Sequence, residues 1–162
     1  MIQIRTAPRA MIFAALFATA PIIAPMAAEA QTAIAPAGAG TPTDPLAPAD
    51  VDLNALMWVA RPLIVFADSP QDPNFQRQMQ LLAADPESLV DRQVLVVADT
   101  DAQALSDLRR RFRPNGFAIL LIDTNGRVLL TRPTPRPVRE IAAAVDKSPQ
   151  RRQELQDRRS GG

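Results

Sequence analysis

The sequence predicts an α/β fold in which strands and helices alternate and a β-hairpin follows. Two uninterrupted apolar runs, residues 63–67 and 94–98, have the composition of strands covered on both faces. Capping residues and helical spacing of apolar side chains follow each run. Asn125-Gly126 then separates two further strand-like segments, and this dipeptide is typical of a tight hairpin. The predicted order is βαβα, a β-hairpin and a C-terminal helix.

A short helix is expected over residues 51–60, ahead of the first strand. Asp50 or Asp52 can cap this helix, and the apolar side chains Leu53, Leu56 and Met57 follow the cap at helical spacing. Trp58 falls at the end of the segment. Because its large apolar body favours burial, we expect Trp58 to fill the core, although a ligand platform is an alternative.

The segment after the first strand carries two capping patterns, Ser69-Pro70 and Asp72-Pro73. In each pattern a capping side chain precedes a proline, as at the first position of many helices. A helix with an apolar face then extends to the Asp-Pro pair at residues 85–86, which favours one further short turn.

This loop is the candidate functional site, because ligands of α/β sheets gather at the carboxyl ends of strands. Asp68, Ser69 and Asp72 lie in it, and Arg77 follows about one helical turn later. Capping and loop solvation explain the first three residues. Alternatively, the free amides of a helix start, together with Arg77, hold a small anion. These four residues are the predicted binding surface.

The second strand leads into a helix expected over residues 102–112, capped from the segment Asp99-Thr100-Asp101. Its apolar face is expected to comprise Leu105, Leu108 and Phe112. The last turn is crowded with arginines, Arg109, Arg110, Arg111 and Arg113. Cations complement the negative end of a helix, so we expect a solvated terminus; a basic docking patch is the alternative.

The third and fourth strands are expected over residues 117–123 and 127–132. With a hairpin as their connection, the first three strands are expected to be parallel and the fourth antiparallel at an edge. A final helix is expected to start at Pro137 and to stop at Ser148-Pro149. Its buried face comprises Val138, Ile141, Ala142 and Val145. Residues 150–162 are polar, and form either a frayed helix or a tail.

The composition excludes several kinds of chemistry. The chain of 162 residues fits one domain, and it contains no cysteine and no histidine. Disulfides, thiol catalysis, thiolate or imidazole metal sites and Ser-His-Asp catalysis are therefore excluded. We expect no cofactor, no metal and no catalytic residue, although an oxygen-ligand Ca²⁺ or Mg²⁺ site remains possible. The net charge of +1 gives no indication of nucleic-acid binding.

Residues 1–30 have the pattern of a secretory signal peptide: a basic start with Arg5 and Arg9, an apolar run and a small-x-small site ending at Ala30. We expect cleavage after Ala30, a periplasmic or secreted location, and no stable membrane insertion afterwards. An uncleaved anchor is the alternative. Residues 31–50 are rich in Ala and Pro and are expected to form a mobile linker.

Five segments carry a resemblance to a known family: Trp58, Arg-Pro-Leu-Ile-Val-Phe-Ala at 61–67, the loop at 68–73, and residues 117–126 and 146–154. They resemble the bacterial family named domain of unknown function 4174, over about residues 51–155. A similar domain closes the sushi-repeat extracellular proteins of animals. The resemblance implies a thioredoxin-like three-layer sandwich over residues 51–149, exported, with no established activity.

The chain departs from thioredoxins at the redox site. Asp68-Ser69-Pro70-Gln71 stands where Cys-x-x-Cys is expected, and the proline expected near Phe117 or Ala118 is missing. The hairpin turn at 123–126 also lacks the lysine that the family resemblance implies. Disulfide exchange and peroxide reduction are therefore not expected.

The leading hypothesis is an exported, non-catalytic module that binds an unidentified periplasmic or envelope protein. One alternative is a binder of small anions or metabolites at the helix starts after Ala67 and Asp99. The other is a hydrolase in which Asp68 or Asp72 acts as a general base.

Overall fold

The computed structural model describes residues 44–161. The expected signal peptide and residues 31–43 of the expected linker lie outside this range. The described elements, in chain order, are η1 (Pro48–Asp50), β1 (Arg61–Phe66), α1 (Pro73–Ala83), α2 (Pro86–Val90), β2 (Val94–Asp99), α3 (Asp107–Phe112), β3 (Ala118–Ile122), β4 (Val128–Arg132), α4 (Val138–Asp146) and α5 (Pro149–Ser160).

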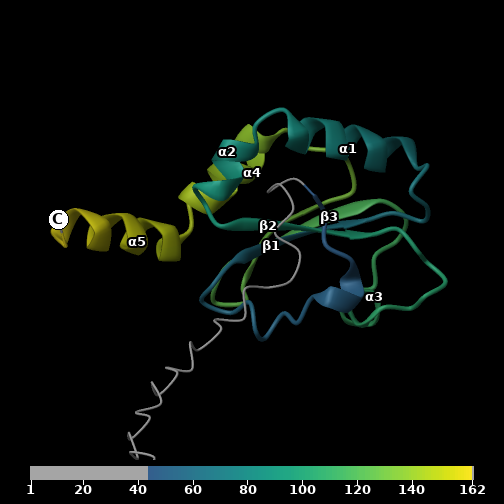
Figure 1. Cartoon of the computed structure of the whole chain (residues 1–162), viewed down its shortest axis with the longest axis horizontal. Helices are drawn as coiled ribbons and strands as arrows, with labels where there is room; N and C mark the ends of the chain where they lie inside the picture. The colour runs from purple at the N-terminus through teal and green to yellow at the C-terminus, as the bar shows by residue number, and fades with distance from the viewer. Residues whose placement is uncertain (1–43, 162) are drawn as a thin grey trace, which may run out of the picture. The chain divides into compact units, whose positions relative to one another are not determined.

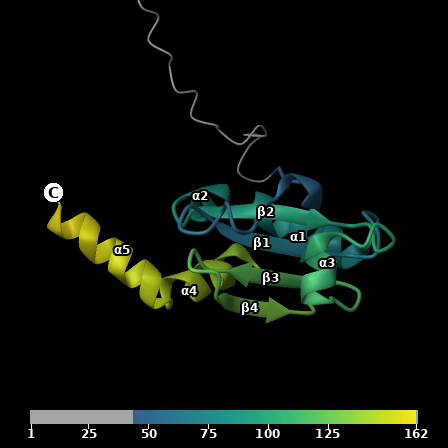
Figure 2. The ribbon, with the colours of Figure 1, turned by 90° about the horizontal axis from the view of Figure 1, so that it is seen from below.

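The four strands form one mixed sheet in the order β2-β1-β3-β4. β1 and β2 are parallel, whereas β3 is antiparallel to β1, as the opposed arrows in Figure 2 show. The expectation of three parallel strands was wrong. A crossover must carry the chain back along a strand of about 20 Å, but α3, with its six residues, is only about 9 Å long. Ala118, the first residue of β3, therefore pairs with Phe66, the last residue of β1.

The predicted hairpin is confirmed. β4 is antiparallel to β3, with a register irregularity next to Ile122. In the turn, the Gly126 amide donates to the Asp123 carbonyl at 2.9 Å, and Gly126 has a φ of 81°. Glycine adopts this left-handed conformation without the steric cost that a side chain brings.

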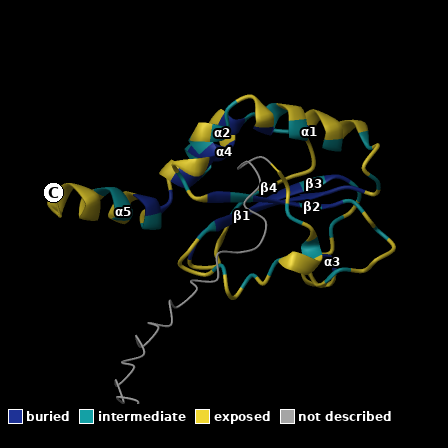
Figure 3. Cartoon of the chain, in the orientation of Figure 1, coloured by how far each residue is buried: buried dark blue, intermediate teal, exposed yellow. Residues whose placement is uncertain are grey.

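Two layers cover the sheet, which gives a three-layer thioredoxin-like sandwich (Figure 1). Helices α1, α2 and α4 lie on one face, where alternate strand residues such as Leu63, Val96 and Leu121 meet Leu82 and Ile141. On the other face α3 and the chain near residues 51–53 cover a smaller cluster. β1, β2 and β3 are mostly buried, as the blue segments of Figure 3 show, whereas the residues of β4 are intermediate or exposed.

Residues 51–60 form a series of turns instead of the expected helix. The Trp58 amide donates to the Thr124 carbonyl at 2.7 Å, and Trp58 has a φ of 67°. This left-handed backbone is unusual for a residue other than glycine. The side chain is 65% exposed, so the expectation that Trp58 fills the core was wrong.

The second helix is shorter than expected. α3 begins only at Asp107, because Ser106 is the residue whose side chain accepts from the Arg109 amide. The side chain of Asp101 accepts instead from the amides of Gln103 and Ala104, in a local bend. Leu105 lies outside the helix and is exposed, contrary to its expected place on the buried face.

The final helix is confirmed, with its expected buried face of Val138, Ile141, Ala142 and Val145. The segment after it is helical too. Helix α5 projects away from the sheet in both Figure 1 and Figure 2. Only Arg151, in its first turn, is buried.

Leu46 pairs with the outer edge of β2. Its amide donates to the Val96 carbonyl at 2.9 Å, and its carbonyl accepts from the Ala98 amide at 3.0 Å. This part of the expected mobile linker is therefore placed on the sheet. Among the residues described, no helix is both long and apolar enough to cross a membrane.

Candidate functional site

The loop after β1 uses one of its carboxylates to cap a helix. Asp72 accepts hydrogen bonds from the amides of Asn74 at 2.7 Å and Phe75 at 3.2 Å. These bonds satisfy two of the free amides at the start of α1. Ser69 contributes a carbonyl, which accepts from the Asp72 amide at 3.2 Å. The capping interpretation of Asp72 is confirmed, whereas Ser69 caps no helix.

The other two residues of the predicted site, Arg77 and Asp68, contact different parts of the molecule. Arg77 is exposed and donates to Gln80 of its own helix at 3.4 Å. Asp68 is exposed and faces the loop before β3: its Oδ2 lies 3.9 Å from the point that a Cβ would occupy on Gly116. The fold therefore brings Asp68 next to Gly116.

Behind this loop, a buried ion pair occupies the carboxyl ends of β1 and β2. The Arg109 Nε donates to Asp99 Oδ1 at 2.7 Å, and its side chain is only 8% exposed. Its Nη2 donates to the carbonyls of Ala67 and Asp99. The guanidinium also lies over the Phe66 ring, 5.7 Å from the centroid. Arg109 thus joins α3 to Ala67, the residue that follows β1.

Ser106 completes this network. Its hydroxyl donates to Asp99 Oδ2, and the hydroxyl oxygen of Ser106 accepts from the Arg109 amide at 3.1 Å. Both oxygens of the Asp99 carboxylate are therefore engaged. Because Asp99 is also buried, this carboxylate holds α3 against the end of the sheet.

Sequence reasoning missed this pair, although two signals were present. Asp99 ends an apolar run directly, and Arg109 lies four residues after Leu105 and three before Phe112. That spacing places it on the apolar face of the expected helix. The four arginines were instead considered together as a solvated helix end, which is wrong for Arg109.

A second polar network lies at the opposite end of β1. Arg61 is fully buried; its Nε donates to Asp123 at 2.8 Å and its Nη1 to the Arg92 carbonyl at 3.0 Å. Its Nη2 donates to Glu154 of α5. Arg151 donates to the same Glu154 carboxylate at 3.2 Å. These bonds fasten the first turns of α5 to the sheet.

An ion pair at the surface extends this network. Arg92 donates to both oxygens of Asp146 at 2.9 Å, in a two-pronged geometry. The hydrogen bond from Arg92 lowers the pKa of Asp146 below its ordinary value of 3.8, and the same bond raises the pKa of Arg92. The pair joins the turn after α2 to the end of α4.

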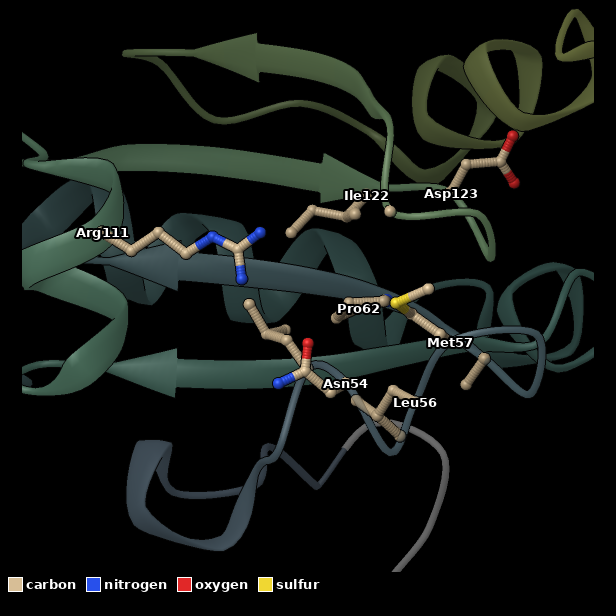
Figure 4. Close-up of a pocket in the computed structure, with 10 residues that line it drawn as sticks. Asn54, Leu56, Met57, Pro62, Arg111, Ile122 and Asp123 are labelled. Carbon is tan, nitrogen blue, oxygen red and sulfur yellow. The ribbon is translucent and has the colours of Figure 1, made fainter.

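One hollow is enclosed between the turns at 53–57 and the sheet. Its volume is about 30 Å³, close to the space that a single water molecule takes up. Figure 4 shows the Arg111 guanidinium turned toward Ile122 and Asn54, while the Asp123 carboxylate points away toward the helices. This hollow is too small for an organic ligand.

A much larger groove, about 620 Å³, lies between β4 and the helices α4 and α5. Its charged lining residues are Arg127, Arg132, Glu140, Lys147 and Arg152. The remaining lining is mostly apolar and comes from Val128, Leu129, Leu130, Ala143 and Ala144. The groove is thus lined by basic and apolar side chains.

No cluster of three or more acidic side chains suited to a metal ion occurs within residues 44–161. A further hollow of about 570 Å³ lies beside η1 and the 101–107 bend. It includes the exposed Leu105 and the engaged Asp99. Neither observation indicates a reactive centre.

The arrangement defines a thioredoxin-like domain without a thiol site. The structure of the reduced 2-Cys peroxiredoxin of Plasmodium vivax is similar, with a TM-score of 0.50 and 14% sequence identity. The similarity covers 59% of this chain and 81% of that chain. At this identity the likeness shows the fold alone.

Residues 52–154 match the family described as domain of unknown function (DUF4174), and the chain belongs to that family. The matched range includes both buried networks and ends at Glu154, the partner of Arg61. No curated protein matches the chain. Since the sequence has no cysteine, it lacks the thiolate on which thiol redox catalysis depends.

Proposed function

We propose that this protein is an exported, non-redox thioredoxin-fold module that binds a protein of the cell envelope or periplasm and catalyses no reaction. The observation that carries the proposal is the Asp99–Arg109 pair. It fills the carboxyl ends of β1 and β2 with groups that already have partners. The fold retains its usual place for chemistry, but its own side chains occupy it.

A carboxylate hydrolase has less support. A general base needs a free oxygen and a positioned partner. Asp72 accepts from two backbone amides through Oδ1 as the cap of α1, and Asp68 is exposed beside Gly116. Within the described residues no hydrogen bond joins Asp68 or Asp72 to Arg77, so neither carboxylate has the positioned partner that a catalytic base needs.

A small-anion site at the start of α1 also has less support, because Asp72 places its own negative charge on the amides there. At the second helix start, Ser106 accepts from the Arg109 amide and α3 has only six residues. Protein binding requires no such free amides, since interfaces form on broad exposed surfaces.

The export step of the proposal rests on the leader pattern of residues 1–30. We expect the protein purified from the bacterial periplasm to begin at Gln31. N-terminal sequencing of the recovered protein tests this directly. A start at Met1 in a membrane fraction would show an uncleaved anchor instead.

The binding proposal is tested by cross-linking in intact cells, with the full chain expressed from its own leader. The loop variant combines Asp68→Asn, Ser69→Ala and Arg77→Gln with Asp72→Asn, since asparagine retains capping ability. A matched control, Arg158→Gln with Asp157→Asn, changes α5 beyond its buried first turn. We expect one cross-linked protein partner with the native chain and with the control.

Loss of that partner in the loop variant would place the interface at the carboxyl end of β1. Retention of the partner would exclude this surface and leave the binding function intact. Absence of any cross-linked partner, together with turnover in a hydrolase screen, would overturn the proposal.

A further inference from the structure

Within residues 44–161, the outer side of β4 is an unpaired edge of the sheet. At the β2 edge, Leu46 donates to and accepts from the strand, so part of that edge is paired. At the other edge β4 pairs with β3 on one side, and no described segment pairs with its outer side. An outer strand of this kind offers a row of unpaired amides and carbonyls to another chain.

The basic groove follows this open edge. Side chains of a strand alternate between its two faces. Nevertheless, the consecutive residues 127–130 all line the groove, and so does Arg132. Residues of both faces meet one groove where that groove borders the edge of the strand. This lining indicates that the groove borders the outer edge of β4.

The charge of the groove is strongly one-sided. Four cations, Arg127, Arg132, Lys147 and Arg152, face a single carboxylate, Glu140. Within residues 44–161, none of the four cations forms an ion pair. Glu140 is itself paired with Arg136. A net charge of +3 thus borders a backbone edge that is free to bond.

We propose that this groove binds an extended, acidic segment of a partner protein, which adds to the sheet as a fifth strand beside β4. The inference rests on the proposed binding function and names the partner's chemistry. Backbone hydrogen bonds would supply the strand pairing, and alternate side chains would choose the sequence. Acidic side chains would meet the four cations, while small apolar ones would contact Ala143 and Ala144.

Two other occupants fit the groove less well. A second copy of this chain, paired β4 to β4, would bring two sets of four cations together, which costs free energy. The alternative is that no chain binds there. The cations would then only protect the edge from association, as charged side chains commonly do. Edge protection, however, does not need cations away from β4, whereas Lys147 lies directly after α4 and Arg152 lies on α5.

The probe is a fluorescein-labelled peptide of ten residues in which glutamate alternates with valine. Its matched control has proline at each valine, which keeps the charge, removes the valine amides and fixes φ near −65°, far from the strand value. We expect the first peptide to bind at low salt and to weaken as salt is raised. We expect the proline peptide to bind about tenfold more weakly.

Two protein variants of equal charge change locate the site. Arg127→Glu with Arg132→Glu reverses the sign of the groove's net charge. Arg158→Glu with Arg159→Glu makes the same change in charge near the end of α5. We expect at least about a tenfold loss of affinity in the first variant and less than about a twofold change in the second. Amide exchange measured by NMR should slow on the outer side of β4 when the peptide is bound.

Equal affinity for the two peptides, or unchanged exchange in β4, would overturn strand addition. Equal losses in the two variants would show that net charge alone drives binding, and would overturn the siting. Formation of a β4-paired dimer without peptide would make the second copy the occupant. If the cross-linked cellular partner is retained by the groove variant, this inference fails while the binding function stands.

Discussion

Arg109 and Asp99 form a buried ion pair in which Nε lies 2.7 Å from Oδ1, and the same guanidinium donates to the carbonyl of Ala67. The pair lies at the carboxyl ends of β1 and β2 and joins α3 to both of them. The part of the sheet where related folds hold reactive groups is therefore part of the core in this protein.

The first prediction concerns the stability that this pair provides. Arg109→Leu should lower the free energy of unfolding by about 3–5 kcal/mol, because it leaves the Asp99 charge buried without its cation. Urea unfolding followed by circular dichroism measures the loss.

The double variant Asp99→Leu with Arg109→Leu is the control for that prediction. It removes both charges, so it should be less destabilised than the sum of the single variants. A double variant that equals the sum would show that the two side chains do not act together.

The second prediction concerns Glu154, which accepts from the buried Arg61 and Arg151. Glu154→Gln should lower the free energy of unfolding by about 1–3 kcal/mol, since two buried cations lose a charged acceptor. Arg61 keeps its bond to Asp123, which limits the loss. Thermal unfolding at pH 7 provides the measurement.

Glu140→Gln is the matched control, because Glu140 accepts from Arg136 at an exposed position. Its effect should stay below about 1 kcal/mol, as for most surface pairs. Equal effects of the two substitutions would contradict the importance of the α5 contact.

The third prediction concerns pH and the Arg92–Asp146 pair. The pKa of Asp146 is lowered in the folded protein by its hydrogen bond from Arg92. The pair therefore stabilises the fold above the ordinary carboxyl pKa, and the contribution disappears as the pH falls through the lowered pKa.

The Asp146→Asn variant should accordingly be less stable than the native protein at pH 7, by less than about 1 kcal/mol for this partly exposed pair. The difference should vanish in acid, below the lowered pKa. Urea unfolding at pH 7 and near the acid limit gives the comparison. A difference that grows as the pH falls would have the wrong sign.

The fourth prediction uses Trp58, the single tryptophan of the chain. Because its side chain is 65% exposed, its fluorescence should be readily quenched by acrylamide in the folded state. The emission maximum should move little on unfolding. Strong protection from quenching would instead indicate a buried indole.

Trp58→Gly tests the backbone at the same position. Its φ of 67° costs a residue with a side chain roughly 1–2 kcal/mol, whereas glycine adopts it freely but loses more chain entropy on folding. We expect the variant to unfold at a temperature close to that of the native protein. A large loss of stability would mean that the indole packs against the domain.

Local sequence signals predicted the strands, the hairpin and the last helix, because each depends on nearby residues. The apolar runs fixed β1 and β2, and Asn125-Gly126 fixed the turn before β4. The direction of β3 could not be obtained in this way. It depends on where the 100–117 connection lies in space, and a short α3 within a long loop resembles one longer helix in its apolar spacing.

The candidate site shows the same limit. Capping by Asp72 could be predicted, since its bonds reach only two and three residues along the chain. The bonds of Arg61 to Asp123 and Glu154 span 62 and 93 residues, and no local pattern indicates them. Trp58 was misplaced for a related reason, because a distant carbonyl of Thr124 holds its backbone.

The link between Arg61 and Glu154 also bears on the order in which the molecule can be completed during synthesis. Arg61 leaves the ribosome 93 residues before its partner Glu154. Until α5 has emerged, the strand at the centre of the sheet carries a cation that lacks one of its acceptors. The domain therefore reaches its final stability only after α5 has been made.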